Sequence, residues 1–236
     1  MNVLSVKGLC KSYPGFSLQN VSFEIKEGTI MGFVGRNGAG KSTTLKSILN
    51  LVHMDTGSVV FFGLDLKEHE GAIKQRIGYT GGAVNFYKKK KIKHIIEITK
   101  SFYKNWDDEI CGEYMKMFSL DMEKTPSELS EGMKVKLSLV LALSHGAELL
   151  ILDEPTSGLD PVSRNELLEI FKHLKSKGIS ILFSTHIISD LEKCADEITY
   201  IRNGKLIYTG HILGFAGEQV SLEDAMVQYE KETNYE

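Results

Sequence analysis

A glycine-rich segment at residues 35–42 constrains this chain more than any other feature of its sequence. It reads Gly-Arg-Asn-Gly-Ala-Gly-Lys-Ser, which matches the spacing G-x-x-x-x-G-K-[S/T]. The apolar run 29–34 before it is short enough for a buried strand, and apolar residues recur at helical spacing after it, from Leu45 to Val52. A strand, a tight loop and a helix in this order predict an α/β domain.

The residue types of this loop predict that it binds phosphate. Glycines let backbone N–H groups turn inward around phosphate oxygens, and the helix that begins near Lys41 adds the partial positive charge of its N-terminus. Lys41 supplies a full positive charge for the β- and γ-phosphates of a nucleotide, and the Ser42 hydroxyl is placed to ligate Mg²⁺. A plain glycine-rich turn is the alternative, but the strand before the loop and the helix after it favour the phosphate-binding (Walker A) interpretation.

Two adjacent acids, Asp153 and Glu154, follow the apolar run 149–152. The run predicts a central strand, so the acids should emerge at its C-terminal edge, where ligands of α/β sheets bind. Asp153 would hold Mg²⁺ directly or through water, and Glu154 would orient and deprotonate an attacking water. A strand can also end in two acids at the surface without any function. The phosphate-binding loop upstream favours the functional (Walker B) interpretation.

Several other segments have the pattern of strands. Residues 21–26 alternate between apolar and polar, 58–62 are β-branched and aromatic, and 179–183 form a further apolar run. The segments 198–201 and 206–209 flank an Asn-Gly pair and predict a hairpin. We expect the first and last thirds of the chain to pack together.

The stretch 88–143 between these strands is mostly helical in pattern, so a helical insert interrupts the α/β core. One predicted helix starts at the acids of residues 107–108 and carries an apolar stripe. A further helix, beyond this insert, is predicted to begin at Asp160-Pro161 and to end at Gly178. The stripe of the first is Ile110, Tyr114, Met117 and Phe118, and the apolar face of the second is Leu167, Leu168, Phe171 and Leu174.

Composition excludes several classes of protein. The chain has 236 residues, 42% of them hydrophobic and 25% charged, with a formal net charge of −3, which is typical of a globular protein and argues against a nucleic-acid coat. No segment approaches the ~20 apolar residues of a membrane-spanning helix, and the N-terminus does not have the pattern of a signal peptide. We expect a cytosolic protein whose three scattered cysteines, Cys10, Cys111 and Cys194, are reduced.

Further motifs resemble the ABC ATPase family over nearly the whole chain, from about residue 4 to residue 210. The segment 129–133, Leu-Ser-Glu-Gly-Met, resembles the L-S-G-G-Q signature. Ser-Gly-Leu-Asp at 157–160 resembles the D-loop, and Ser-Thr-His at 184–186 resembles the switch histidine. Tyr13 resembles the aromatic residue that stacks on adenine. The fold class implied is a P-loop NTPase core of the ABC ATPase type with an inserted helical subdomain and an antiparallel β part.

The resemblance implies a domain division and an ATP site. A single ABC ATPase domain would comprise an α/β core at 1–82 and 149–210, a helical subdomain at 83–148 and a C-terminal tail at 211–236. The catalytic residues implied are Glu154, the base, and His186, which would contact the γ-phosphate and hold the water and Glu154 in place. The metal ligands implied are Ser42 and Asp153. The ATP-binding residues implied are Tyr13, Gly35, Arg36, Asn37, Gly38, Ala39, Gly40, Lys41, Ser42, Thr43, Ser130 and Gly132.

The family also implies partners. Two subunits, identical or different, would sandwich two ATP molecules, each between the Walker A loop of one subunit and the signature loop of the other, where Ser130 and the Gly132 N–H bind the γ-phosphate. A transmembrane permease would hold the ATPase at the inner face of the cell membrane and select the cargo. The signature methionine Met133 and the C-terminal Ser-Leu-Glu-Asp at 221–224 resemble ATPases of bacterial drug, antibiotic or bacteriocin exporters.

The sequence departs from the family at two positions. Gly82 stands where a Gln usually ligates Mg²⁺ and senses the membrane partner, and Asn85 is a nearby substitute. Glu131 replaces a signature glycine, and we expect its carboxylate to face solvent, where screening weakens its repulsion of phosphate. The basic run 88–93 is interpreted as a solvated helix start, or more specifically as a contact for anionic lipid or an acidic partner helix.

Two other functions compete with the transport ATPase. One is an ATP-dependent dimerisation switch with little hydrolysis, which the Gly82 departure would explain. The other, a DNA-repair or chromosome ATPase, needs a long coiled coil between Lys41 and Leu129, where no heptads are sustained. The histidines other than His186 are expected to be structural or to face solvent: His53, His69, His94, His145, His173 and His211.

Overall fold

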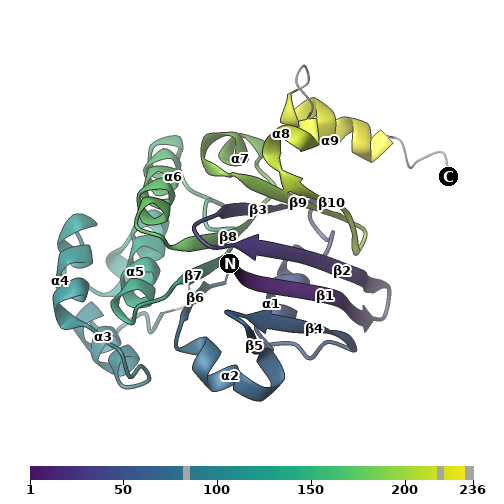
Figure 1. Ribbon diagram of the computed structural model, residues 1–236. Helices are drawn as coiled ribbons and strands as arrows, with labels where there is room; N and C mark the ends of the chain where they lie inside the picture. Colours follow the sequence, from purple (N-terminus) through teal and green to yellow (C-terminus); the bar gives the residue numbers. More distant parts are fainter. Residues whose placement is uncertain (82–85, 217–220, 232–236) are drawn as a thin grey trace.

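The computed structural model describes residues 1–81, 86–216 and 221–231 (Figure 1). Its strands form one curled sheet in the order β5-β4-β1-β2-β10-β9-β3-β8-β7-β6. One part, β9-β3-β8-β7-β6, is parallel, and the other, β5-β4-β1-β2, is antiparallel. The α/β fold with an antiparallel part is confirmed.

The parallel strands alternate their side chains between two hydrophobic clusters. In β3 (Ile30–Val34), Ile30 and Val34 face one cluster, whereas Met31 and Phe33 face the other. Because successive side chains of a strand point to opposite faces, both faces of the sheet are covered, and the centre of such a strand is apolar on both sides. The same alternation holds in the neighbours β7 (Leu149–Asp153), β8 (Ser180–Thr185) and β9 (Glu197–Arg202), whereas the edge strand β6 (Ile77–Thr80) contributes only Ile77 to a cluster.

The antiparallel strands and the parallel strands share a core, as predicted for the first and last thirds of the chain. Leu4 and Phe23 of the antiparallel strands lie in one cluster with Met31, Ile151 and Ile201. Helix α1 (Lys41–Ile48) packs into this cluster, and Val52 lies beyond its end. The strands are β1 (Asn2–Tyr13), β2 (Phe16–Lys26), β4 (Thr56–Phe61) and β5 (Leu64–Asp65), and α2 (Leu66–Lys74) follows them.

The helices of the predicted insert lie together at one side of the sheet (Figure 1). They are α3 (Ile92–Lys100), α4 (Asp108–Met117), the 3₁₀ turn η1 (Pro126–Glu128) and α5 (Glu131–Ser144). Their apolar residues join the cluster that covers the other face of the sheet, so this helical region has no separate core among the described residues.

The predicted stripe of α4 is only half right. Tyr114 and Phe118 are buried, but Ile110 and Met117 are exposed, and Cys111 and Met115 take the buried positions. The helix is rotated by about one residue from the expected orientation because packing against α5 selects this face. The Asp107 side chain caps α4, accepting from the backbone N–H groups of Glu109 and Ile110, as its acidic start predicted.

Helix α6 (Pro161–Ser176) buries the predicted face and begins at an Asp160 cap. The other three helices that follow β7 were not predicted from the sequence. After β10 (Lys205–His211), the predicted tail forms α8 (Ile212–Ala216) and α9 (Leu222–Lys231), which pack beside α7 (Ile188–Cys194), away from the helical region (Figure 1). The Asn203-Gly204 hairpin joins β9 and β10, with both residues at positive φ. The proposed domain boundaries stay a prediction.

Candidate functional site

The loop between β3 and α1 is tightly fitted into the sheet. A Cβ at Gly35 would lie 2.4 Å from the Ile201 carbonyl oxygen, and one at Gly40, whose φ is +114°, would lie 2.7 Å from Leu18. The backbone N–H of Gly204 donates to the Ala39 carbonyl, so the β9–β10 turn also holds the loop. These glycines are required by close approach as well as by backbone conformation, and the loop is a preformed cradle.

Lys41 is a buried cation at the base of this cradle, with a side chain only 4% exposed. Its Nζ donates to the carbonyl oxygens of Gly35 and Arg36, at 2.8 and 3.3 Å. The same Nζ lies 3.3 Å from Oε1 of Glu154. A buried ammonium needs such partners, and they aim its charge into the loop.

The two acids after β7 are positioned by one serine of β8. The Ser184 hydroxyl donates to Oδ1 of Asp153 at 2.6 Å and accepts from the backbone N–H of Glu154 at 2.9 Å. Glu154 has a φ of +50°, in the left-handed region that a side chain rarely adopts. Ser184 thus holds the turn in which the chain changes direction and the Glu154 carboxylate leaves the sheet edge.

The Glu154 carboxylate lies between two basic groups. One oxygen contacts Lys41, and the other lies 3.4 Å from Nδ1 of His186. The Glu154 side chain is 25% exposed and that of His186 is 40% exposed, so both reach solvent. The structure therefore brings together the predicted phosphate lysine, the predicted base and the predicted switch histidine.

Open clefts adjoin this cluster. One of about 530 Å³ is lined by the loop from Asn37 to Thr43, by Gly15 and Phe16, and by Glu154. A second of about 630 Å³ shares Gly15, Phe16 and Gly38 with the first and reaches Tyr13 and Asn203. Because they share these residues, the two clefts adjoin and run from Glu154 past the loop to Tyr13. Tyr13 is 43% exposed.

The signature residues lie elsewhere. Neither Ser130 nor Gly132 lines a cleft that contains the loop 35–43 among the described residues. Ser130 caps α5, where its hydroxyl accepts from the Met133 N–H at 3.3 Å, and Gly132 lies beside Ser163 of α6. The Glu131 side chain is 61% exposed and pairs with Lys134, so it faces solvent as expected.

Residues suited to Mg²⁺ are present, although the described residues include no group of three acids, histidines or cysteines. Ser42 lines the cleft, and Asp153, 6% exposed, is held by Ser184 and directly precedes Glu154, which also lines the cleft. Burial, together with the negative charge of Asp153, raises the pKa of Tyr79 on the neighbouring strand. A hydroxyl and a carboxylate suit this hard cation, which usually takes only one or two protein carboxylates and completes its shell with water and phosphate oxygens.

A buried hydrogen bond joins the turn that follows Glu154 to the helix that follows His186. Thr156 Oγ1 donates to Oδ2 of Asp190 at 2.6 Å, and both side chains are buried. This bond ties the turn after Glu154 to α7, the helix that follows His186. The bond therefore joins the backbone segment just after Glu154 to the backbone segment just after His186.

Two further predictions concern residues near β6. Gly82 and Asn85 lie outside the described residues. The basic run is exposed at Lys88, Lys89 and Lys90, and its last members, Lys91 and Lys93, flank Glu123, whose pKa they lower to about 2. The run is thus a solvated helix start that is partly neutralised.

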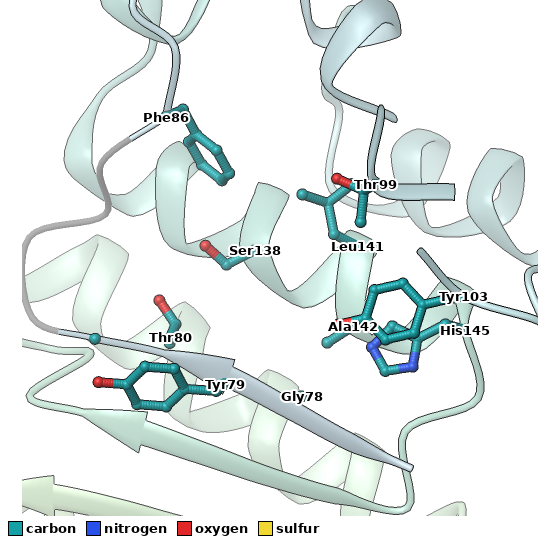
Figure 2. A pocket seen from close by; sticks show the side chains of 11 residues that line it. Gly78, Tyr79, Thr80, Phe86, Thr99, Tyr103, Ser138, Leu141, Ala142 and His145 are labelled. Atoms are coloured by element: carbon teal, nitrogen blue, oxygen red, sulfur yellow. The ribbon is translucent and has the colours of Figure 1, made fainter. Parts of the chain in front are cut away.

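The histidines outside the site behave as predicted. Five are exposed. His145, at the end of α5, is buried (2% exposed) and stacks on Tyr103 with ring centroids 3.7 Å apart. Burial lowers the pKa of His145. This pair borders a cavity of about 230 Å³ between β6 and α5, with Tyr79 and Ser138 on its walls (Figure 2).

Sequence reasoning missed the roles of Phe16, Ser184 and Asn203. Phe16 lies at the start of β2, and its aromatic type close to Tyr13 was the available signal. Ser184 belongs to the Ser-Thr-His motif, but its bonds to both acids depend on the pairing of Asp153 with Ser184 in adjacent strands. Asn203 was identified only as a turn residue.

Comparisons with known proteins agree with this geometry. A family model described as "ABC transporter" matches residues 18–157. The chain is 33% identical to the ABC transporter ATP-binding protein YtrB of Bacillus subtilis (strain 168), covering 86% of this chain and 70% of YtrB. It is 34% identical to the bacitracin transport ATP-binding protein BcrA of Bacillus licheniformis, covering 81% of this chain and 63% of BcrA, so it spans less than two thirds of that relative.

A further relative and the solved structures extend the comparison. The lantibiotic transport ATP-binding protein SrtF of Streptococcus pyogenes is 34% identical, with 87% of this chain and 89% of SrtF covered. A solved ATP-binding subunit of an ABC transporter is 28% identical, with a TM-score of 0.87 over 97% of this chain and all of that one. An ATP-binding cassette bound to ADP and phosphate, 22% identical over 89% of this chain and 98% of that one, shares the fold with a TM-score of 0.78.

Proposed function

As a member of the ABC transporter family, this chain is an ATP-binding and ATP-hydrolysing transporter subunit, and we propose that it powers an exporter of antibiotic-like compounds. The family model and the relatives carry the first statement. The export proposal is supported by the printed functions of the bacitracin and lantibiotic transport relatives.

The clefts suggest how ATP binds. The base would stack on Tyr13, with Phe16 beside the sugar, and the phosphates would enter the loop 35–43. Lys41 then turns from Glu154 to the β- and γ-phosphates. The incoming phosphate charge replaces that of the carboxylate, so nucleotide binding itself frees Glu154 for catalysis.

Glu154 is the proposed general base. Its carboxylate accepts a proton from a water molecule as the water oxygen bonds to the γ-phosphorus and the bond to the β,γ-bridging oxygen breaks, leaving ADP and phosphate. His186, on the other side of Glu154, would hold the γ-phosphate and the water in line. Ser184 keeps the base pointing out of the sheet edge.

We further propose that Mg²⁺ accompanies the nucleotide, with Ser42 and Asp153 as its protein ligands. When bound, the ion would neutralise phosphate charge. Asp153 suits this role because the Ser184 hydroxyl donates to one of its oxygens and fixes the orientation of the carboxylate. The exposed helix start at Ser130 lies outside the cleft of its own chain, so a second subunit would supply it to the γ-phosphate.

The proposed complex lies at the cytoplasmic face of a membrane. No helix in the described parts of this chain is long and apolar enough to cross a bilayer. A permease subunit would provide the path and bind the cargo, and two ATPase subunits would open and close beneath it. The basic residues Lys88, Lys89 and Lys90 are candidate contacts for that partner or for anionic lipid. Their replacement by Gln should weaken association with permease or liposomes and leave ATP binding unchanged.

The contact of Glu154 with both Lys41 and His186 is the single observation that carries the hydrolytic proposal. It is tested by measuring phosphate release from Mg-ATP for the wild type and for Glu154→Gln over a range of protein concentrations. Loss of the base should lower turnover by roughly 10²–10⁴-fold, while ATP binding persists. Wild-type turnover should rise more than linearly with concentration because each site needs two subunits.

Absence of turnover in the wild type, despite ATP binding, would favour the dimerisation switch instead. The repeat with the permease partner then decides whether hydrolysis depends on that partner. A wild-type rate strictly proportional to concentration over the whole range would contradict the shared site.

A further inference from the structure

Asp190 is a buried acid that is not among the proposed catalytic groups. It lies in the first turn of α7, it is fully buried, and its Oδ2 accepts from the Thr156 hydroxyl at 2.6 Å. Its other oxygen, Oδ1, is also buried and has no hydrogen-bond partner among the described residues. An oxygen that is removed from water and left unpaired costs free energy. The Asp190 carboxylate is therefore a costly way to join two segments, which points to a role other than stability.

The Thr156–Asp190 bond joins the two segments that carry Glu154 and His186. Thr156 lies two residues after Glu154, and Asp190 lies four residues after His186. The chain between His186 and Asp190 is itself held, because the Asp190 N–H donates to the Ile187 carbonyl at 3.2 Å. A displacement of Asp190 would therefore be passed to the backbone beside His186, and a displacement of Thr156 to the backbone beside Glu154.

The contact between Glu154 and His186 lies beyond the ends of the strands. Glu154 is the first residue after β7, His186 is the first residue after β8, and the pairing of these two strands ends before either residue. Their side chains are 25% and 40% exposed, and 3.4 Å separates Oε2 of Glu154 from Nδ1 of His186. Their relative position therefore depends on the segments that follow the strands, which the Thr156–Asp190 bond links.

We propose that Asp190 is a positioning residue for ATP hydrolysis, which holds Thr156 and thereby fixes the Glu154 carboxylate relative to the His186 ring. This inference rests on the proposed function, because it takes Glu154 as the base and His186 as the group that holds the γ-phosphate. The bond suits this task because it is short and shielded from water, and a low local dielectric strengthens a hydrogen bond. A misplacement of about 1 Å in a catalytic group can slow a reaction roughly 100-fold.

The experiment separates positioning from stability by replacing both partners with apolar residues. Thr156→Val alone leaves the Asp190 carboxylate without a partner, so the midpoint of urea denaturation should fall. The double variant Thr156→Val/Asp190→Leu removes both polar groups and keeps the branched shapes of both side chains. It should regain the wild-type midpoint, because replacing both partners of a buried pair by apolar groups is often neutral.

Turnover should not recover with stability. Phosphate release at saturating Mg-ATP, without urea, should stay roughly 10–100-fold below the wild type in the double variant, because the bond that positions Glu154 and His186 is absent. The dissociation constant for ATP should not change, since neither Thr156 nor Asp190 lines the clefts at the loop 35–43. Asp190→Asn, which keeps an oxygen acceptor for Thr156, should restore most of the turnover.

Thr199→Val is the matched control. Thr199, on β9, is a buried threonine like Thr156, and its hydroxyl bonds to that of Thr209 on β10 at 2.9 Å. Its loss should lower the urea midpoint and leave the turnover of the folded protein unchanged.

Wild-type turnover in a double variant that has regained its midpoint overturns the inference and leaves the proposed base intact. If the midpoint is not regained, the comparison of Thr156→Val with Thr199→Val decides. Slower turnover in Thr156→Val alone supports positioning, whereas equal turnover in the two variants contradicts it. Undiminished turnover in Glu154→Gln would instead remove the proposed base, and the role of Asp190 with it.

Discussion

The phosphate-binding loop 35–42 and the signature segment 129–133 both precede a helix, yet they are built differently. The first is enclosed by β2 and β9, with Lys41 buried at its base. The second is an ordinary capped helix start, and Ser130 uses its hydroxyl on its own helix. A complete cradle can bind phosphate within one chain, whereas an exposed helix start becomes a ligand only when another molecule supplies the phosphate.

The largest expected effect comes from comparing the variant Gly35→Ala with the variant Gly132→Ala. The new methyl group would lie 2.4 Å from the Ile201 carbonyl oxygen at Gly35, but at an ordinary 3.4 Å from Ser163 at Gly132. We expect Gly35→Ala to lose about 1–3 kcal/mol of unfolding free energy and its ATP binding as well. Gly132→Ala should keep both. Urea denaturation and ATP titration measure the two effects, and similar losses in both variants would contradict the comparison.

Lys41→Ala against Ser130→Ala separates binding within one chain from binding between chains. Loss of the Lys41 ammonium should weaken ATP binding to the monomer by roughly 10–100-fold, since bonds to charged groups contribute about 1.5–3 kcal/mol. Ser130→Ala should leave monomer affinity unchanged and lower concentration-dependent turnover. Its lost cap should cost about 1 kcal/mol of stability. Titrations at protein concentrations too low for dimers make the measurement, and a weakened Ser130→Ala monomer would show that Ser130 acts in its own chain.

Ser184→Ala tests whether Ser184 positions Asp153 and Glu154. The substitution removes a donor to Asp153 and an acceptor for the Glu154 N–H, so two buried groups lose a partner. We expect a loss of about 1–3 kcal/mol in unfolding free energy and slower phosphate release. Ser138→Ala on α5 is the control, because its hydroxyl donates to the Lys134 carbonyl of its own helix. Equal effects in both variants would argue against a positioning role for Ser184.

The smallest expected effect lies at the C-terminal end of α5, where burial lowers the pKa of His145. The unfolded chain then binds more protons than the folded one as the pH falls through about 6.5, so His145 reduces stability on acidification. His145→Phe, which keeps a ring against Tyr103, should show a smaller loss of unfolding free energy between pH 7.5 and pH 5.5, a range of roughly one pH unit to either side of that value. An unchanged pH dependence would mean that His145 does not titrate in this way. Denaturation at several pH values is the test.

Much of the site followed from the sequence because its signals are local. A glycine-rich spacing, an apolar run ending in two acids and an Asp-Pro helix start each specify a conformation within a few residues. Lys41, Glu154 and His186 were each singled out by such a local pattern, and the structure brings them together because the parallel strands place their C-terminal ends side by side.

Other features depended on contacts between distant segments. In the sequence of α4, two sets of apolar residues at helical spacing share Tyr114 and Phe118. Packing against the rest of the protein buries the set with Cys111 and Met115 and leaves Ile110 and Met117 exposed. The position of α9 beside the phosphate-binding loop likewise depends on Phe215 and Arg202. The sequence by itself determined the chemistry of the loop and the acids, since their patterns are short. The tertiary structure decided which helix faces are buried and what borders the site, because these features depend on contacts between distant segments, and the alternative sets of contacts are similar in energy.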